Sequence, residues 1–100
     1  MKRPLRARFT PEAAALIGKL HPVAKRMIRS AIRSLKENPY QGHELQLDLA
    51  GFRSFRVRTY RIIFYLNDEK GYMEVYYVGH RRDIYESFRE LLMKHEISSE

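Results

Sequence analysis

Residues 52–66, FRSFRVRTYRIIFYL, decide the fold of this chain. Residues 52–59 alternate Phe55 and Val57 with polar side chains, the period of two that is typical of a half-buried strand. Residues 60–66 are rich in aromatic and β-branched side chains, which favour strands. We therefore expect two adjacent strands here, with the rest of the domain arranged around them.

The flanking segments predict more of the sheet. Residues 67–71, NDEKG, are typical of a hairpin loop, and the apolar residues 72–78 that follow predict a central strand. Residues 45–49 alternate leucines with polar side chains and are expected to be extended before a turn at Gly51. Residues 5–9 alternate in the same way and predict a short first strand.

Three helices are expected from their start signals. Thr10, Pro11 and Glu12 give an N-cap, a first-turn proline and an acid for a helix over residues 11–20. A second helix over residues 22–37 carries apolar side chains at helical spacing and ends before Pro39. Asp83 is expected to cap a last helix over about residues 84–95.

The expected element order is β-α-α-β-β-β-α in a single domain over residues 1–100. This order predicts an α+β fold in which an N-terminal strand and a helical hairpin pack on a mostly antiparallel sheet of about four strands, with a C-terminal helix. We expect the residues of functional interest on the sheet face that the hairpin leaves open.

Composition excludes several classes of protein. The chain has no cysteine, which excludes disulfides, thiolate metal sites and thiol nucleophiles. The four histidines, at positions 21, 43, 80 and 95, lack metal-ligand spacing, so we expect neither a metal nor another cofactor. No apolar run suits a membrane helix and the basic N-terminus lacks the apolar core of a signal peptide, so we expect a cytoplasmic protein with no membrane partner.

The charge is strongly basic and unevenly placed. Lys and Arg number 19 against 12 Asp and Glu, and residues 1–36 hold ten of the basic residues with one acid, Glu12. Such a balance suits nucleic acid or an acidic partner. Four cations of the second expected helix are candidates for contacts with RNA phosphates: Lys25, Arg26, Arg29 and Arg33. A solvated helix face explains these cations equally well.

A second group of arginines lies on the expected strands. Arg53, Arg56, Arg58 and Arg61 fall within nine residues that contain no acid, and we expect Arg56 and Arg58 to project from one face of one strand. Arg81 and Arg82 follow the next strand, and Tyr85 opens the last helix. Like charges repel across a sheet, so this grouping indicates a site for an anion such as the phosphates of a nucleic acid.

Two motifs resemble those of a known family. Residues 51–64, GFRSFRVRTYRIIF, and residues 78–85, VGHRRDIY, are similar to the core and closing motifs of the RelE/ParE toxin superfamily. RelE-like members are ribosome-dependent endoribonucleases that cut mRNA without a metal, whereas ParE-like members poison DNA gyrase. The resemblance implies a cognate acidic antitoxin, mRNA on the ribosome with ribosomal RNA contacts, and operator binding through the antitoxin.

The resemblance also implies roles for individual residues. Arg61 would brace the scissile phosphate, Arg81 would act near the leaving group, and Tyr85 would orient the attacking 2′-hydroxyl or stack on the substrate. Arg56 matches the second of two basic strand positions. The first falls on Ser54, where RelE-like enzymes often have lysine.

The general base is left open by these residues, because arginine stays protonated in proteins. His80 is a candidate base or acid, and the alternative is that it only shapes the turn after its strand. The hypothesis is thus an mRNA endonuclease that uses 2′-hydroxyl attack with arginine stabilisation of the transition state. The alternatives are a ParE-like gyrase inhibitor without ribonuclease activity, and a basic nucleic-acid-binding module without catalysis.

Overall fold

The computed structural model describes residues 3–80 and 82–98. Its elements, in chain order, are β1 (Arg6–Phe9), α1 (Pro11–Gly18), α2 (Pro22–Glu37), the 3₁₀ helix η1 (Pro39–Gln41), β2 (His43–Glu44), the 3₁₀ helix η2 (Leu47–Leu49), β3 (Phe52–Val57), β4 (Tyr60–Asn67), β5 (Tyr72–His80) and α3 (Ile84–Ser98). The fold class is the predicted α+β arrangement.

The sheet has the order β1-β5-β4-β3-β2. β1 runs parallel to β5, and all other neighbours are antiparallel. The sheet has five strands rather than about four, because the two-residue β2 adds an edge strand beside β3. β3, β4 and β5 therefore form its centre, as the apolar runs of the sequence predict.

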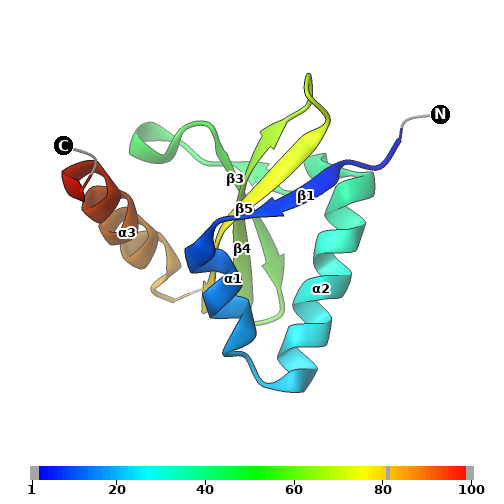
Figure 1. Ribbon diagram of the computed structural model, residues 1–100, viewed down its shortest axis with the longest axis horizontal. Helices are drawn as coiled ribbons and strands as arrows, with labels where there is room; N and C mark the ends of the chain where they lie inside the picture. The colour runs from blue at the N-terminus through cyan, green and yellow to red at the C-terminus, as the bar shows by residue number, and fades with distance from the viewer. Residues whose placement is uncertain (1–2, 81, 99–100) are drawn as a thin grey trace.

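Helices cover both faces of the sheet (Figure 1). α1 and α2 pack on one side, here called the hairpin face, over a core that includes Ile28, Leu35 and Phe64. α3 packs on the other side, here called the α3 face, through Ile84 and Phe88. The expectation of an open face is thus wrong in part, because the apolar side of α3 needs a surface against which to be buried.

The start signal of α1 acts as the sequence predicts. The hydroxyl oxygen of Thr10 accepts a hydrogen bond of 3.1 Å from the backbone N–H of Ala13, and Pro11 occupies the first turn. His21 caps α2 in the same way through Nδ1, which accepts from Val23 N–H at 3.3 Å. These caps fix where the hairpin turns, and hence which side of α2 meets the sheet.

Residues 45–49 correct the sequence-based prediction. They are not a strand: residues 47–49 form η2, with hydrogen bonds from Leu49 N–H to Gln46 and from Ala50 N–H to Leu47. Leu47 has φ 56° and is 89% exposed, while Leu49 is buried against α3. Leu45 N–H still bonds to the backbone oxygen of Phe52 at 2.9 Å, but the next turn closes on itself. The alternation of leucines therefore reflects one anchoring side chain, Leu49, in a local turn.

None of the helices in the described part of the chain is long and apolar enough to span a membrane.

Candidate functional site

A buried serine lies at the centre of the α3 face and receives two hydrogen bonds. Ser54 of β3 is 0% exposed. Its Oγ accepts from Nη1 of Arg61 on β4 at 3.3 Å and from the hydroxyl of Tyr85 on α3 at 3.2 Å. The Arg61 guanidinium carbon also lies 6.0 Å from the centre of the Tyr85 ring. These three residues are called the Ser54 cluster below.

Strand register brings the cluster together. Ser54 pairs with Ile63, and Arg56 pairs with Arg61 directly across β3 and β4, so all four side chains lie on one face. Packing of α3 supplies Tyr85: Phe88, one turn further along, meets Phe52 of β3 edge-on with ring centres 5.0 Å apart. The contact between Phe88 and Phe52 thus holds α3 where the Tyr85 hydroxyl can reach Ser54.

Arg56 adds a second cation beside Arg61. It is exposed, and its Nε donates to the backbone oxygen of Arg58 at 3.2 Å. Neither Arg56 nor Arg61 forms an ion pair within the described residues. Two like charges directly opposite on neighbouring strands destabilise a sheet, so an anion bound between them would relieve this repulsion.

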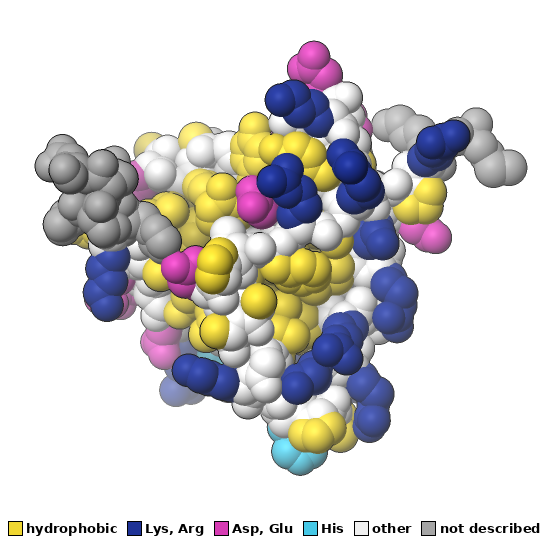
Figure 2. Space-filling model, in the orientation of Figure 1, with side chains coloured by type: hydrophobic (Ala, Val, Ile, Leu, Met, Phe, Trp, Pro, Cys, Tyr) yellow, Lys and Arg dark blue, Asp and Glu magenta, His cyan; other side chains and the backbone are white. Residues whose placement is uncertain are grey.

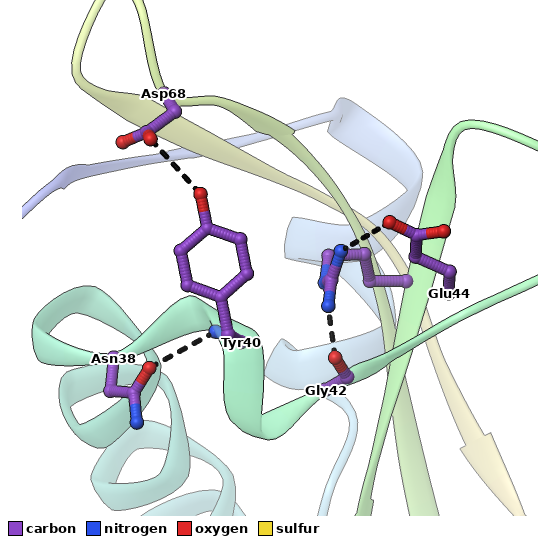
Figure 3. Close-up of polar contacts among 6 residues, drawn as sticks. Asn38, Tyr40, Gly42, Glu44 and Asp68 are labelled. Atoms are coloured by element: carbon purple, nitrogen blue, oxygen red, sulfur yellow. Dashed lines mark hydrogen bonds and ion pairs between the residues drawn. The ribbon is translucent and has the colours of Figure 1, made fainter.

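Arg53 lies on the hairpin face and is not part of this group. Its Nε donates to the backbone oxygen of Gly42 at 3.0 Å, and its Nη1 pairs with Glu44 at 3.2 Å. It also lies 5.1 Å from the ring centre of Tyr40, whose hydroxyl donates to Asp68 (Figure 3). Arg53, Tyr40, Gly42 and Glu44 are called the Arg53 cluster below. The acidic contact of the Tyr40 hydroxyl raises the pKa of that phenol.

Arg58 also departs from the prediction. β3 ends at Val57, and Arg58 lies in the turn to β4 with φ 56°. The prediction that Arg56 and Arg58 share one face of a strand is therefore wrong, because the chain has left the strand before position 58. Arg58 instead lines a shallow groove of about 560 Å³ with Arg26 and Met27 of α2.

The candidate site residues that follow β5 do not all lie beside Arg61. His80 is exposed and its ring stacks on Tyr60 with centres 4.7 Å apart. Tyr60 belongs to the core beneath α1 and α2, so His80 lies on the hairpin face and points away from Arg61. Arg82 is exposed in the turn before α3, and Arg81 lies outside the described residues.

The cations of α2 flank an apolar groove. Arg29, Arg33 and Lys36 border a hollow of about 530 Å³ whose lining includes Phe9 and Ile32. Figure 2 shows Lys and Arg side chains following the edge of the molecule that α2 forms, beside apolar surface. Lys25 is half-buried and Arg26 is exposed. Arg29 and Arg33 line this hollow whereas Arg26 lines the groove beside Arg58, so the candidate RNA contacts of α2 lie on two sides of the helix.

No group of three His, Asp or Glu side chains that could hold a metal ion occurs among the residues with described positions. The Ser54 cluster and Arg56 offer cationic and neutral hydrogen-bonding groups. Such groups bind a phosphate and stabilise negative charge that develops on it.

Comparisons with solved structures identify the class of fold. The crystal structure of the RelBE2 toxin–antitoxin complex from Mycobacterium tuberculosis matches with a TM-score of 0.74 and 32% identity, over 79% of this chain and all of that one. The intact RelBE complex of Escherichia coli shares the fold, with a TM-score of 0.66 and 18% identity over 78% of this chain and 98% of that one.

Sequence comparison gives the family. The model of the ParE toxin of type II toxin–antitoxin systems matches residues 7–85. Toxin RelG of Mycobacterium tuberculosis is 34% identical over 84 residues, which are 82% of this chain and 97% of that toxin. The chain belongs to the RelE/ParE superfamily and is a toxin of the type II toxin–antitoxin class, which confirms the resemblance of the two motifs.

The contacts of Ser54 are the part of the candidate site that the sequence alone did not predict. Ser54 stood out only as a departure from a basic pattern, whereas the structure gives it contacts with two of the candidate site residues. The available signal was the strand alternation, which places Ser54 on the same face as Arg56.

Proposed function

We propose that this toxin is a ribosome-dependent endoribonuclease that cleaves mRNA and so inhibits translation. The observation that carries the proposal is the α3 face, where Arg56, Arg61 and Tyr85 come together and neither arginine has an acidic partner among the described residues. Such unpaired guanidinium groups are available to a phosphate.

The chemistry requires little more than charge and orientation. The 2′-hydroxyl of the message attacks the adjacent phosphate and gives up its proton, the bond to the 5′-oxygen breaks, and the 5′-oxygen takes up a proton. The products are a 2′,3′-cyclic phosphate and a 5′-hydroxyl. Negative charge builds on the phosphoryl oxygens and then on the leaving oxygen, and fixed guanidinium groups stabilise it more than they stabilise the ground state. We assign Arg61 and Arg56 to the phosphate, Arg81 to the leaving group and Tyr85 to the attacking hydroxyl.

In this proposal the ribosome aligns the message, and such alignment removes a large part of the activation free energy of the reaction. Lys25, Arg26, Arg29 and Arg33 of α2, with Arg58 and Arg82, are the cations that we assign to RNA phosphates. All of them except the half-buried Lys25 are exposed, and α2 carries few acids, which supports this assignment. His80 is directed away from Arg61 and receives no role in the reaction.

We also propose a cognate acidic antitoxin as the protein partner in the cytoplasm. The toxin–antitoxin complexes among the structural relatives support this partner, and the basic border of the apolar groove beside α2 suits an acidic segment with apolar side chains. Operator binding by the complex would then reside in the antitoxin.

A ParE-like inhibitor of DNA gyrase is the second candidate. The match to the ParE toxin model and the serine at position 54 favour it. In that case the cations of the α3 face would contact gyrase or its DNA, and no RNA would be cut.

A translation reaction with primer-extension mapping separates these candidates. We expect wild-type protein to produce discrete mRNA cuts that need the ribosome, and Arg61→Ala and Arg81→Ala to lose them. Equal cleavage by all three proteins would remove the assigned site. Inhibition in a gyrase supercoiling assay without any mRNA cleavage would decide for the second candidate.

A further inference from the structure

The two donors that converge on Ser54 come from different layers of the molecule. Arg61 reaches it from the neighbouring strand, and Tyr85 reaches it from the first turn of α3, 31 residues further along the chain. The serine is completely buried, so water does not compete for its oxygen. One neutral oxygen thus fixes the spacing between a guanidinium and a phenol.

We propose that Ser54 is a positioning residue of the site, which holds Arg61 and Tyr85 in their working geometry without touching the RNA. This inference rests on the proposed function for its activity measurement. The phenolic proton of Tyr85 points inward to Ser54, which leaves the lone pairs of the phenolic oxygen free to accept a hydrogen bond from the attacking hydroxyl.

A neutral side chain is required at this position by its surroundings. A lysine at 54 would bury an ammonium group beside the Arg61 guanidinium, which costs both desolvation and like-charge repulsion. An ammonium also has no lone pair, so it would offer no acceptor to either Arg61 or Tyr85. The site of this chain is therefore built around an acceptor rather than around a base.

The test compares four variants for cleavage on programmed ribosomes: Ser54→Ala, Ser54→Thr, Ser54→Lys and Tyr85→Phe. Ser87→Ala, the same truncation on α3 outside the cluster, is the matched control. We expect Ser54→Ala to lower kcat by about 10- to 100-fold with KM within about twofold, because the lost contact orients groups rather than binding substrate.

Further comparisons separate positioning from simple stability. Ser54→Thr keeps the hydroxyl, so it should be more active than Ser54→Ala even if the added methyl lowers its melting temperature. Ser54→Ala and Tyr85→Phe should be strongly non-additive when combined, because they break the same hydrogen bond. Ser54→Lys should be no more active than Ser54→Ala.

Three results would overturn the inference. The first is wild-type kcat in Ser54→Ala, and the second is equal activity of Ser54→Ala and Ser54→Thr. The third is higher activity in Ser54→Lys than in Ser54→Ala, which would indicate that position 54 can hold a catalytic base. If Ser54→Ala does not fold, Ser54→Gly removes the same hydroxyl and is judged by the same kcat criterion.

A measurement on the isolated chain distinguishes failure of this inference from failure of the proposed function. The side-chain N–H resonances of Arg61 and the ring resonances of Tyr85 should shift in Ser54→Ala and stay unchanged in Ser87→Ala. They should do so whether or not wild type cleaves mRNA. If wild type is inactive on ribosomes, the proposed function fails. If the resonances do not move, the positioning role fails.

Discussion

Two arginines on neighbouring central strands have opposite surroundings. Arg53 of β3 faces α2, where Glu44, the Gly42 carbonyl and the Tyr40 ring surround it, and only 13% of its side chain is exposed. Arg61 of β4 faces α3, and its side chain makes one hydrogen bond to the described residues, with the neutral Ser54. Residue type alone therefore does not identify a functional arginine in this sheet. An arginine paired with acid contributes to the fold, whereas one held by a neutral acceptor keeps its charge for a ligand.

The most direct test of this difference between Arg53 and Arg61 is to replace each arginine in turn. We expect Arg61→Ala to reduce mRNA cleavage by about 10²- to 10³-fold, as for the loss of one donor to a developing oxyanion. Arg53→Ala should retain most of the wild-type kcat at temperatures where it is folded. The measurement is primer extension under single-turnover conditions, with thermal unfolding of each variant alongside.

Arg61→Lys sharpens the same contrast. Lysine keeps the charge but lacks the planar fork of donors, so we expect only partial recovery over Arg61→Ala. A loss of cleavage in Arg53→Ala as large as that in Arg61→Ala, with both proteins folded, would contradict the separation of the two faces.

The second prediction concerns packing in the Arg53 cluster. A Cβ at Gly42 would lie 2.9 Å from two ring atoms of Phe64, which is fully buried, and 3.3 Å from the backbone oxygen of Ser54. We expect Gly42→Ala to lower the free energy of unfolding by about 1–3 kcal/mol, because neither neighbour has room to move. Urea denaturation gives the measurement.

Gly18→Ala is the matched control for this packing argument. A Cβ at Gly18, at the end of α1, meets nothing within 4 Å, so the exchange should be neutral or stabilising. Equal stability of the two alanine variants would show that the hairpin face tolerates added volume beside Phe64.

The third prediction concerns the contribution of exposed cations on the hairpin side to RNA binding. Arg29→Glu reverses a charge at the border of the α2 groove, and Lys70→Glu makes the same change in the loop between β4 and β5. If α2 contacts ribosomal RNA, Arg29→Glu should raise KM and reduce the slope of log affinity against log salt by about one. Lys70→Glu should leave both unchanged. Equal effects of the two variants would indicate a dependence on net charge alone.

The sequence predicted the helices, the central strands and the family because these depend on local signals: caps, periodicity and two motifs. The face on which each arginine lies depends on where strands end. β3 ends at Val57, so Arg58 does not share a strand face with Arg56. Alternation along β3 places Arg53 and Arg56 on opposite faces of the sheet. The Ser54 cluster could not be predicted, because Tyr85 joins it through the packing of Phe88, a contact between segments far apart in the sequence.

The smallest effect expected is a pH dependence on the α3 face. Arg89 of α3 donates to Asp48 of η2 at 2.7 Å, and this hydrogen bond lowers the pKa of the Asp48 carboxyl below its ordinary value of 3.8. A depressed pKa in the folded state means that the stabilisation is present above the unfolded value and is lost as pH falls through the folded value. Asp48→Asn should therefore be less stable than wild type at neutral pH, and the difference in stability should vanish in acid. The difference should be small and should shrink in high salt, because both side chains are exposed. Urea titrations at several pH values measure it. A difference that persists below the folded pKa would mean that Asp48 stabilises η2 through its local backbone contacts rather than through its charge on α3.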